Sequence, residues 1–490
     1  MVDTVVAQVG AVARAHPNDP ALIFDGELWT YAQLWSRTEQ IARGLLGLGL
    51  RPGQPVGIIG RNESAYVAAY LGIMRAGCVA VPVNTMLDLA AIRDQLELVG
   101  VRTIFAGRLP DGLRDGLEQD YRLLELAAPP RGPSRPALPR IAPDSVCKIM
   151  LTSGSTGRPK GVEHTHGSIF HTALQMAAAL PFDRTDRGLV FLPLYTCIPE
   201  HVLPALSTGG CLEILPGFDV DRVADACTRA TTFDAVPTIL SRLVEHAPLH
   251  KLAGLRWILF ASEPMPVRLL ETWWDVLPRV ETHQFYGLTE LVSVSVASHA
   301  MLRAEPATVG RAFPTTDLRL DPLEGHGDGG EILAAGPSRM RGYFGDVTAT
   351  NGALTATGAL RTGDIGRVDD RGLVFLTGRL KDIIISGGFN VAPAEIEAVA
   401  FRHGGVQEAI VVGIPSARWG ETPVVVAVPK PGSDVTAEGL LTFCRDALPS
   451  FKRPSAAALV PSLPTTGIGK GDKAAVKRLI AEGRIDLVSA

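Results

Sequence analysis

One segment of the sequence combines hydroxyls, glycines and a lysine in an order suited to binding phosphate. It begins where an apolar run ends and consists of Thr152, Ser153, Gly154, Ser155, Thr156 and Gly157, followed by Lys160. Hydroxyl groups and the backbone N–H groups that glycine exposes can surround phosphate oxygens, and the lysine adds a positive charge. The GxxxxGK[ST] spacing of a Walker loop is absent from the sequence. A flexible turn is the plainer interpretation of a short Gly/Ser match, but the length of this segment favours a phosphate loop.

Further motifs follow in a fixed order along the chain. They are Tyr286-Gly-Leu-Thr-Glu290, Arg361-Thr-Gly-Asp364, Gly378-Arg-Leu-Lys-Asp382, Ser386 to Glu397 and Pro464 to Lys470. Together with the phosphate segment, they make the chain resemble the adenylate-forming superfamily of acyl-CoA synthetases, stand-alone adenylation enzymes and luciferases over nearly its whole length. The resemblance implies ATP-dependent activation of a carboxylic acid as an acyl-AMP, followed by formation of a thioester.

The resemblance assigns nucleotide-binding roles to these residues. It implies that residues 152 to 160 hold the β- and γ-phosphates, that Thr289 contacts the α-phosphate and that Glu290 binds Mg²⁺. Tyr286 would offer its aromatic face to adenine, and Gly287 is assigned to both the nucleotide and the acid side. The loop Ser262-Glu263-Pro264 would line the other side of the base, where relatives more often carry Gly and Ala. Asp364 would accept hydrogen bonds from both ribose hydroxyls, with Arg379 beside them.

Two lysines are assigned to the two half-reactions. Lys470 is implied to bridge the carboxylate and the α-phosphate, which offsets the repulsion between two anions most strongly where water is excluded. The thiol must later reach the same atoms, so the resemblance implies that a small C-terminal domain rotates about Lys381. Gly387 and Gly388 would then let a pantetheine arm pass close to the backbone. With Thr289 and Glu290, these two lysines are the predicted catalytic residues.

The acid pocket in this superfamily is formed by three segments, which here are Tyr195 to Glu200, Thr232 to Thr238 and Leu291 to Ser295. The candidates to line it, besides Gly287, are Thr196, Cys197, Val292 and Asp234. Thr196 stands where many relatives carry a histidine, so the role of that histidine does not transfer.

Asp234 is the unusual residue of this pocket, because its position usually carries an apolar side chain. A buried carboxylate is costly unless it is paired, and a substrate ammonium would pair with it. This pattern resembles the stand-alone enzymes that load β-amino acids onto carrier proteins in macrolactam polyketide pathways. Alternatively, Asp234 caps a helix or pairs with an arginine such as Arg242.

The acceptor thiol is open between a phosphopantetheinyl carrier protein and free CoA. Lys452 and Arg453 could bind the 3′-phosphate of CoA, but the stretch Ser455 to Leu459 after them is uncharged. Trp419 matches a CoA-side aromatic residue of relatives or simply packs within the small domain. We favour loading of a β-amino type acid onto an acyl carrier protein. An acyl- or aryl-CoA ligase is the alternative, and a non-catalytic nucleotide-binding protein is a remote one because Lys470 and Glu290 are both present.

The elements that position these residues alternate between apolar runs and helical patterns. Residues 55–60 and 79–83 favour buried strands around a helix at 63–77, which predicts an α/β fold with mainly parallel sheets. Short runs at 330–335 and 372–377 predict antiparallel strands of a small β-subdomain. We therefore expect an AMP-binding (adenylation) domain at residues 1–380 and a small, mobile α+β domain at residues 381–490.

The composition excludes several classes of protein. The 490 residues are 46% hydrophobic and 20% charged with a net charge of −4, which indicates a globular protein of two or more domains without a basic field for nucleic acid. No apolar run approaches the roughly 20 residues that cross a bilayer, and the N-terminus lacks a secretory pattern. The six scattered cysteines, with no CxxC pair, fit a reducing cytoplasm. We expect a cytoplasmic enzyme that uses ATP, Mg²⁺ and a small carboxylic acid, with no nucleic-acid or membrane partner.

Overall fold

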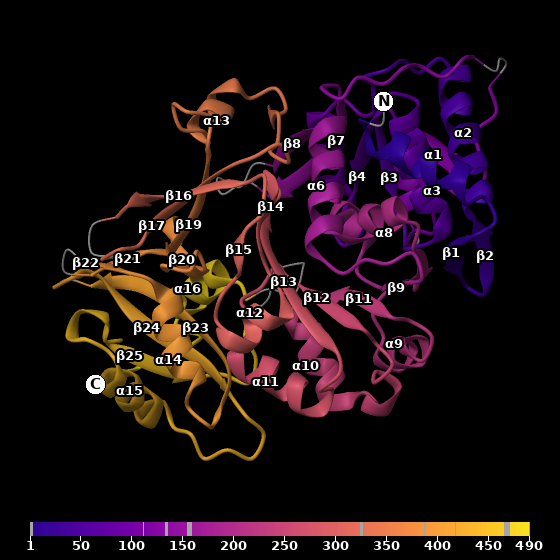
Figure 1. The fold of residues 1–490 in the computed structure, drawn as a ribbon. Helices are drawn as coiled ribbons and strands as arrows, with labels where there is room; N and C mark the ends of the chain where they lie inside the picture. The colour runs from indigo at the N-terminus through magenta and orange to yellow at the C-terminus, as the bar shows by residue number, and fades with distance from the viewer. Residues whose placement is uncertain are drawn as a thin grey trace. The chain divides into compact units, whose positions relative to one another are not determined.

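The structure is a computed structural model that describes residues 3–110, 112–132, 136–153, 159–323, 327–386, 389–416, 418–464 and 471–489, apart from the side chains of Ser153 and Asn390. The chain divides into two compact units (Figure 1). The first unit comprises residues 1–318 and 334–360, and the second comprises residues 319–333 and 361–490.

A nine-stranded sheet, sheet A, forms one half of the first unit. Its strands, in spatial order, are β15 (Arg311–Ala312), β14 (Leu291–Ala297), β13 (Glu281–Leu288), β12 (Trp257–Phe260), β11 (Thr232–Ala235), β9 (Arg187–Val190), β10 (Cys211–Ile214), β1 (Pro20–Phe24) and β2 (Glu27–Thr30). The run from β13 to β1 is parallel, and β14, β15 and β2 add antiparallel edges. Strands β11 and β12 are buried on both faces, as expected for central parallel strands.

A seven-stranded sheet, sheet B, forms the other half of this unit. Its order is β18 (Gly342–Tyr343), β8 (Pro159–Thr165), β7 (Val146–Ser153), β4 (Val79–Pro82), β3 (Pro55–Ile59), β5 (Thr103–Ala106) and β6 (Arg122–Glu125). Strands β7 to β6 are mutually parallel, whereas β8 returns antiparallel to β7 and β18 follows it antiparallel.

Helices pack against these sheets in the first unit (Figure 1). They are α1 (Val5–Ala15), α2 (Tyr31–Gly47), α3 (Ser64–Arg75), α4 (Leu89–Leu98), α5 (Leu113–Glu118), α6 (His166–Ala179), α7 (Leu194–Cys197), α8 (Leu203–Thr208), α9 (Val220–Cys227), α10 (Pro237–His246), α11 (Val267–Val276), α12 (His299–Ala304) and α13 (Val347–Gly352). A π-helical turn, Ile198–Val202, joins α7 to α8. Capping boxes at Thr30 and Thr165 fix the starts of α2 and α6.

The second unit contains most of a four-stranded sheet and all of a six-stranded one. The first has the order β16 (Asp317–Pro322), β17 (Gly330–Ala335), β19 (Leu360–Val368) and β20 (Val374–Arg379). The second has the order β22 (Phe389–Val391), β21 (Ile384–Ser386), β24 (Gly420–Pro429), β25 (Ala456–Leu459) and β26 (Val488–Ser489), with β23 (Val406–Ser416) also paired to β24. Helices α14 (Pro393–Phe401), α15 (Ala437–Ala447) and α16 (Lys473–Ala481) belong to this unit.

The expected fold class is confirmed: a large α/β part with mainly parallel sheets precedes a small α+β part. The predicted buried strands at 55–60 and 79–83 are β3 and β4, and the predicted helix between them is α3. None of the described helices is long and apolar enough to cross a membrane.

Candidate active site

Most predicted site residues of the first unit lie at one edge of sheet A. Strands β9, β11, β12 and β13 are neighbours and parallel, so their carboxyl ends meet at the same edge. The acid-pocket helix follows β9, Asp234 lies in β11, the loop from Ser262 follows β12, and Tyr286 to Glu290 end β13. This edge is where open α/β sheets bind ligands.

The phosphate segment is carried by the hairpin of β7 and β8. Thr152 pairs with Lys160 and Ser153 pairs with Pro159 across the two antiparallel strands. The Thr152 hydroxyl donates a 3.5 Å hydrogen bond to the carbonyl oxygen of Lys160. The predicted phosphate ligands Gly154, Ser155, Thr156 and Gly157 lie outside the described residues, so the structure places only the two ends of the segment.

The motif Tyr286 to Glu290 begins within a strand and includes the last three residues of β13. The reason is the antiparallel strand β14, which pairs back onto the motif and extends the ladder to Leu288. Gly287 lies where the register shifts, and a Cβ atom there would be 1.7 Å from the carbonyl oxygen of Val292. Only glycine therefore allows this close approach of the two strands. Val292, a predicted acid-pocket residue, is buried beside it.

His164 in β8 holds the turn that carries Thr289. Its Nε2 atom is 2.7 Å from the carbonyl oxygen of Thr289, and its Nδ1 atom is 3.2 Å from the Ser168 hydroxyl. Because a carbonyl oxygen only accepts, Nε2 carries the proton and Nδ1 accepts from Ser168. Burial and, to a lesser extent, the Lys148 ammonium lower the pKa of His164 to about 4 against the opposing effect of the hydrogen bond to Thr289, so the ring is neutral at physiological pH.

Tyr343 joins the predicted metal ligand to the predicted phosphate lysine. Its hydroxyl donates a 2.7 Å hydrogen bond to Oε1 of Glu290, and the Nζ atom of Lys160 lies 4.7 Å from the centroid of its ring. Burial and the Glu290 carboxylate raise the pKa of this tyrosine, so it remains a donor. No group of three His, Cys, Asp or Glu side chains that could hold a metal occurs in the described part of the chain.

The loop predicted to line adenine is held by Glu263 and strained at Ser262. Ser262 has φ = 71°, in the left-handed region that side chains rarely adopt. Oε2 of Glu263 accepts hydrogen bonds from the backbone N–H of Thr238 at 3.1 Å and from its hydroxyl at 2.8 Å. Thr238 lies in the first turn of α10, whose N-cap residue Val236 offers no side-chain cap. Glu263, which stands where relatives more often carry a small residue, therefore caps the N-terminus of α10 from a neighbouring loop.

Asp234 is buried, with 6% of its surface exposed, and in the described part of the chain it neither caps α10 nor pairs with Arg242. It does not cap α10, and Arg242 lies instead with its guanidinium carbon 4.9 Å from the ring centroid of Phe218. The salt bridges formed among the described residues do not include Asp234. Burial raises the pKa of Asp234 well above its usual value, and the Glu200 carboxylate raises it further.

The acid-pocket helix is anchored at its start. Asn62 donates to the carbonyl oxygen of Leu192 at 2.8 Å and accepts from the backbone N–H of Leu194 at 2.9 Å. The Thr196 hydroxyl donates to Pro193 O at 2.8 Å. The buried thiol of Cys197 is 3.7 Å from Leu192 O, and burial followed by the charge of Asp234 raises its pKa. Of the predicted pocket residues, the structure thus brings Cys197 and Asp234 into electrostatic contact.

The predicted ribose residues of the second unit lie on adjacent antiparallel strands. Asp364 in β19 pairs with Arg379 in β20, and their side chains form a salt bridge with a 2.9 Å separation between Oδ1 and Nε. Lys381 is exposed on a single 3₁₀ turn, Leu380–Asp382, between β20 and β21. Gly387, Gly388 and Lys470 lie outside the described residues.

Two ionisable residues near Cys197 were not singled out from the sequence, although one of them, Glu200, ends the predicted pocket segment Tyr195 to Glu200. Lys148, in β7, is 5% exposed, and Glu200 lies in the π-helical turn after α7. Burial raises the pKa of Glu200 to about 7 against the opposing effect of Lys148, and burial lowers the pKa of Lys148 against the opposing effect of Glu200. The available signal was a lysine and a glutamate inside otherwise apolar runs.

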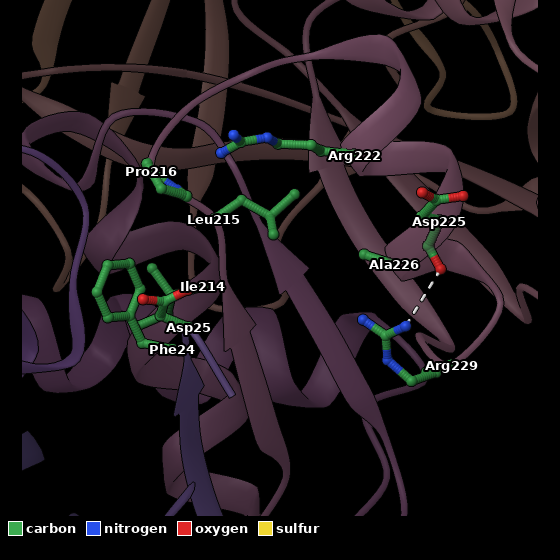
Figure 2. Close-up of a pocket in the computed structure, with 9 residues that line it drawn as sticks. All are labelled: Phe24, Asp25, Ile214, Leu215, Pro216, Arg222, Asp225, Ala226 and Arg229. Atoms are coloured by element: carbon green, nitrogen blue, oxygen red, sulfur yellow. Dashed lines mark hydrogen bonds between the residues drawn. The ribbon is translucent and has the colours of Figure 1, made fainter. Parts of the chain in front are cut away.

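A cavity of about 210 Å³ lies at the same edge of sheet A but beyond β9, at the ends of β1 and β10 (Figure 2). Helix α9 contributes Arg222 and Asp225 to its lining, and Arg229 follows the end of this helix. Arg229 donates to the carbonyl oxygen of Asp225 in α9 at 3.4 Å (Figure 2). It also pairs with Glu213 at 2.6 Å. None of the predicted site residues lines this cavity.

Comparison with known proteins gives consistent matches over the whole chain. The family described as AMP-binding enzyme matches residues 9–344, and the AMP-binding enzyme C-terminal domain matches residues 395–470. The feruloyl-CoA synthase of an Amycolatopsis species is 34% identical, covering 95% of this chain and 97% of that protein. The 2-succinylbenzoate–CoA ligase of Bacillus pumilus is 32% identical and covers 97% of both.

Solved structures resemble the chain over nearly the same length. ATP-bound MatB from Rhodopseudomonas palustris has a TM-score of 0.89 at 26% identity and covers 98% of this chain and 99% of that one. The o-succinylbenzoate CoA synthetase of Bacillus subtilis, in complex with its acyl-adenylate intermediate, has a TM-score of 0.85 at 27% identity and covers 96% and 97%.

Proposed function

Since this chain belongs to the AMP-binding enzyme family and is an ATP-dependent, AMP-forming acid–thiol ligase, we propose that it activates a small carboxylic acid bearing an amino group and transfers the acyl group to the thiol of CoA. One observation carries the choice of acid. Asp234 is buried at the ligand-binding edge of sheet A, and no salt bridge among the described residues compensates its charge. A substrate ammonium is the partner that would do so.

The proposed adenylation step uses the residues of the first unit to align two anions. Residues 152 to 160 would hold the β- and γ-phosphates, Tyr286 and the loop at Ser262 would hold adenine, and Thr289 would contact the α-phosphate. Glu290 would hold Mg²⁺, which offsets phosphate charge when bound. A single carboxylate suits this role, because protein-bound Mg²⁺ commonly takes one or two carboxylates and completes its shell with water and phosphate oxygens.

The second unit supplies the residues that we propose to change between half-reactions. Asp364 and Arg379 would contact the ribose, and Lys470 would bridge the attacking carboxylate and the α-phosphate. We place the hinge between the two moving parts at residue 381. Lys381 is exposed on a short turn between two strands, so a change in its backbone dihedral angles would disrupt few packing contacts. After rotation, Gly387 and Gly388 would line the path of the pantetheine arm.

Two observations support CoA as the acceptor. The feruloyl-CoA synthase and the 2-succinylbenzoate–CoA ligase, which match this chain over their whole length, are both named for CoA. Trp419 is 46% exposed, so it is accessible to a ligand rather than packed into the small domain.

A carrier protein is the second candidate acceptor, favoured by a different observation. Lys452 pairs with Glu395, and Nε of Arg453 donates to Leu448 O at 3.1 Å, so both cations considered for the CoA 3′-phosphate have partners within the domain. A pantetheine arm without that phosphate would not need them.

Exchange of pyrophosphate into ATP tests the proposed acid. The wild-type protein, Asp234→Asn and the control Asp275→Asn, an exposed residue of α11, would be assayed with β-amino acids, α-amino acids and their analogues without the amino group. We expect Asp234→Asn to raise KM for the amino acid about tenfold to a hundredfold, with a change below about threefold for the analogue. Equal preferences in wild type and variant, or exchange only with plain aryl or alkyl acids, would contradict the proposal.

Acyl transfer tests the acceptor. The preferred acid and ATP would be supplied with CoA or with a phosphopantetheinylated carrier protein at equal concentration, and thioesters would be measured by mass spectrometry. We expect acyl-CoA. Transfer to the carrier protein alone would make the second candidate correct.

A further inference from the structure

Three ionisable side chains from separate elements surround Cys197 in the acid pocket. Lys148 comes from β7 of sheet B, Glu200 from the π-helical turn and Asp234 from β11 of sheet A. Cys147, the neighbour of Lys148, and Cys197 belong to the same buried core cluster as Tyr66 and Tyr70. The charges of Lys148, Glu200 and Asp234 also all act on the Cys197 thiol. Lys148 and Asp234 are almost fully buried, at 5% and 6% exposure. A π-helical turn is rare and often marks a functional site.

The charges of this cluster do not cancel. Glu200 is the strongest acidic influence on Lys148, and Lys148 is the strongest cationic influence on Glu200, so these two compensate each other. Asp234 is influenced instead by the like charge of Glu200. In the empty pocket, burial favours protonated carboxylates. When both are ionised, one cation and two carboxylates carry one net negative charge, which is costly in a buried site unless a further cation joins it.

Three polar atoms of the same cluster also lack hydrogen-bond partners among the described residues. Oε2 of Glu200 and the hydroxyls of Tyr66 and Tyr70 are buried and form no hydrogen bond with the described residues. Both tyrosines lie in α3 at 1% exposure; Tyr70 is within the electrostatic influence of Glu200, and Tyr66 within that of Cys197. Buried polar groups are nearly always bonded in native proteins, so this many unpaired groups indicates a place for a polar ligand.

We propose that Lys148 and Glu200 are specificity-determining residues of the acid pocket, which set its charge to minus one together with Asp234 and thereby select acids that carry one ammonium group. This inference rests on the proposed function, in which Asp234 faces the acid. It adds that the cation is recognised by the whole cluster. Glu200 and Asp234 both attract the substrate ammonium. Lys148 balances one of the two carboxylates, so a single ammonium is enough to neutralise the pocket. Carboxylic acids without an ammonium group leave the negative charge of the pocket uncompensated, and acids with two ammonium groups carry more positive charge than the pocket can balance.

Binding should then depend on pH. The titratable and charged groups that face the cluster are Tyr66 and Tyr70 from α3, Cys147 and Lys148 from β7, His164 from β8, Cys197 from α7, Glu200 and His201 from the π-helical turn, and Asp234 from β11. Burial raises the pKa of Glu200 to about 7, so below this pH the empty pocket holds an extra proton. An ammonium group favours the charged carboxylates, so its binding releases that proton. KM for the amino acid should fall as the pH rises through about 7.

Charge-changing variants of the full chain test the cluster. Glu200→Gln leaves Lys148 to compensate Asp234, so we expect KM for the amino acid to rise about tenfold or more, with little change for its analogue without the amino group. Lys148→Met leaves two carboxylates without a cation, so the fall in KM should move to higher pH. The double variant Lys148→Met/Glu200→Gln again has one negative charge, on Asp234. We expect it to recover the amino acid preference to within about threefold of wild type, because the buried charge is restored.

Several outcomes would overturn the inference, and they differ from failure of the proposed function. If wild type prefers the amino acid but the single variants change both substrates equally, or if the effects of the double variant simply add, Lys148 and Glu200 do not select the substrate. If wild type prefers plain acids, the proposed function itself is wrong. Thermal unfolding separates these results from misfolding. If a single variant does not fold, the double variant decides the question. We expect the double variant to lose the pH dependence of KM that the wild type shows near pH 7. A double variant that keeps this pH dependence would contradict the inference.

Discussion

The nucleotide side and the acid side of the candidate site satisfy their polar groups in different ways. On the nucleotide side, Glu290 accepts a hydrogen bond from Tyr343, Thr289 is held through its carbonyl by His164, and Glu263 accepts two hydrogen bonds from Thr238. On the acid side, Glu200 Oε2 and the hydroxyls of Tyr66 and Tyr70 have no hydrogen-bond partner in the described part of the chain.

The difference follows from what each side has to recognise. ATP is the same molecule in every turnover, so a site for it gains from groups that are positioned before binding, which lowers the cost of ordering them. The acid is the variable partner. A pocket whose buried groups are completed only by the correct substrate rejects an analogue that leaves them unpaired. We therefore expect changes on the nucleotide side to affect all acids alike, and changes on the acid side to affect one class of acid.

The largest effect is expected for Lys470→Ala, which should act on neither side selectively. Removing a charge placed between two reacting anions should lower acyl-AMP formation about a hundredfold to a thousandfold with every acid. Conversion of supplied acyl-AMP to thioester should remain near the wild-type rate, because that step no longer joins two anions. Lys477→Ala, in α16, is the matched control. Equal loss of both half-reactions would show that Lys470 has another role.

A smaller effect is expected for Tyr343→Phe. The ring beside Lys160 remains, while Glu290 loses one hydrogen bond, which is worth about 1 to 3 kcal/mol when an ion accepts it. KM for Mg-ATP should rise about fivefold to a hundredfold, by the same factor with amino and plain acids. Steady-state exchange kinetics at varied Mg-ATP would measure this. A change that depends on the acid would break the distinction between the two sides.

The smallest effect concerns stability at low pH. Burial lowers the pKa of His164, His166 and His201 to about 4, so the unfolded chain binds protons that the folded chain does not between pH 6.5 and 4. Stability contributed by each neutral histidine is present above pH 6.5 and is lost as the pH falls to about 4, by up to about 3 kcal/mol.

His166→Gln tests this linkage, because neither ring nitrogen of His166 has a hydrogen-bond partner among the described residues. We expect a shallower dependence of the unfolding free energy on pH, measured by urea denaturation at several pH values. The exposed His246 provides the control, and His246→Gln should leave the dependence unchanged. Parallel curves for His166→Gln and wild type would contradict the assignment.

The sequence predicted those parts of the site that depend on local order. The apolar run before the hydroxyl-rich segment is β7, and the segment joins the ends of β7 and β8. It predicted less well where a distant segment decides the structure. Tyr286 belongs to a strand because β14 pairs with it, and Glu263 has a role because it reaches Thr238. Lys148 and Glu200 were not singled out for the same reason, since Lys148 in β7 and Glu200 in the π-helical turn come near Cys197 only in the folded chain.

The bond from Glu263 to Thr238 has an evolutionary consequence. The loop proposed to recognise adenine also caps the helix that begins directly after the acid-pocket strand β11. A mutation selected for its effect on ATP affinity would therefore alter the start of α10, and with it the backbone next to Asp234. Substitutions at Glu263 alone would therefore change which acids are accepted, with no change among the residues proposed to contact the acid.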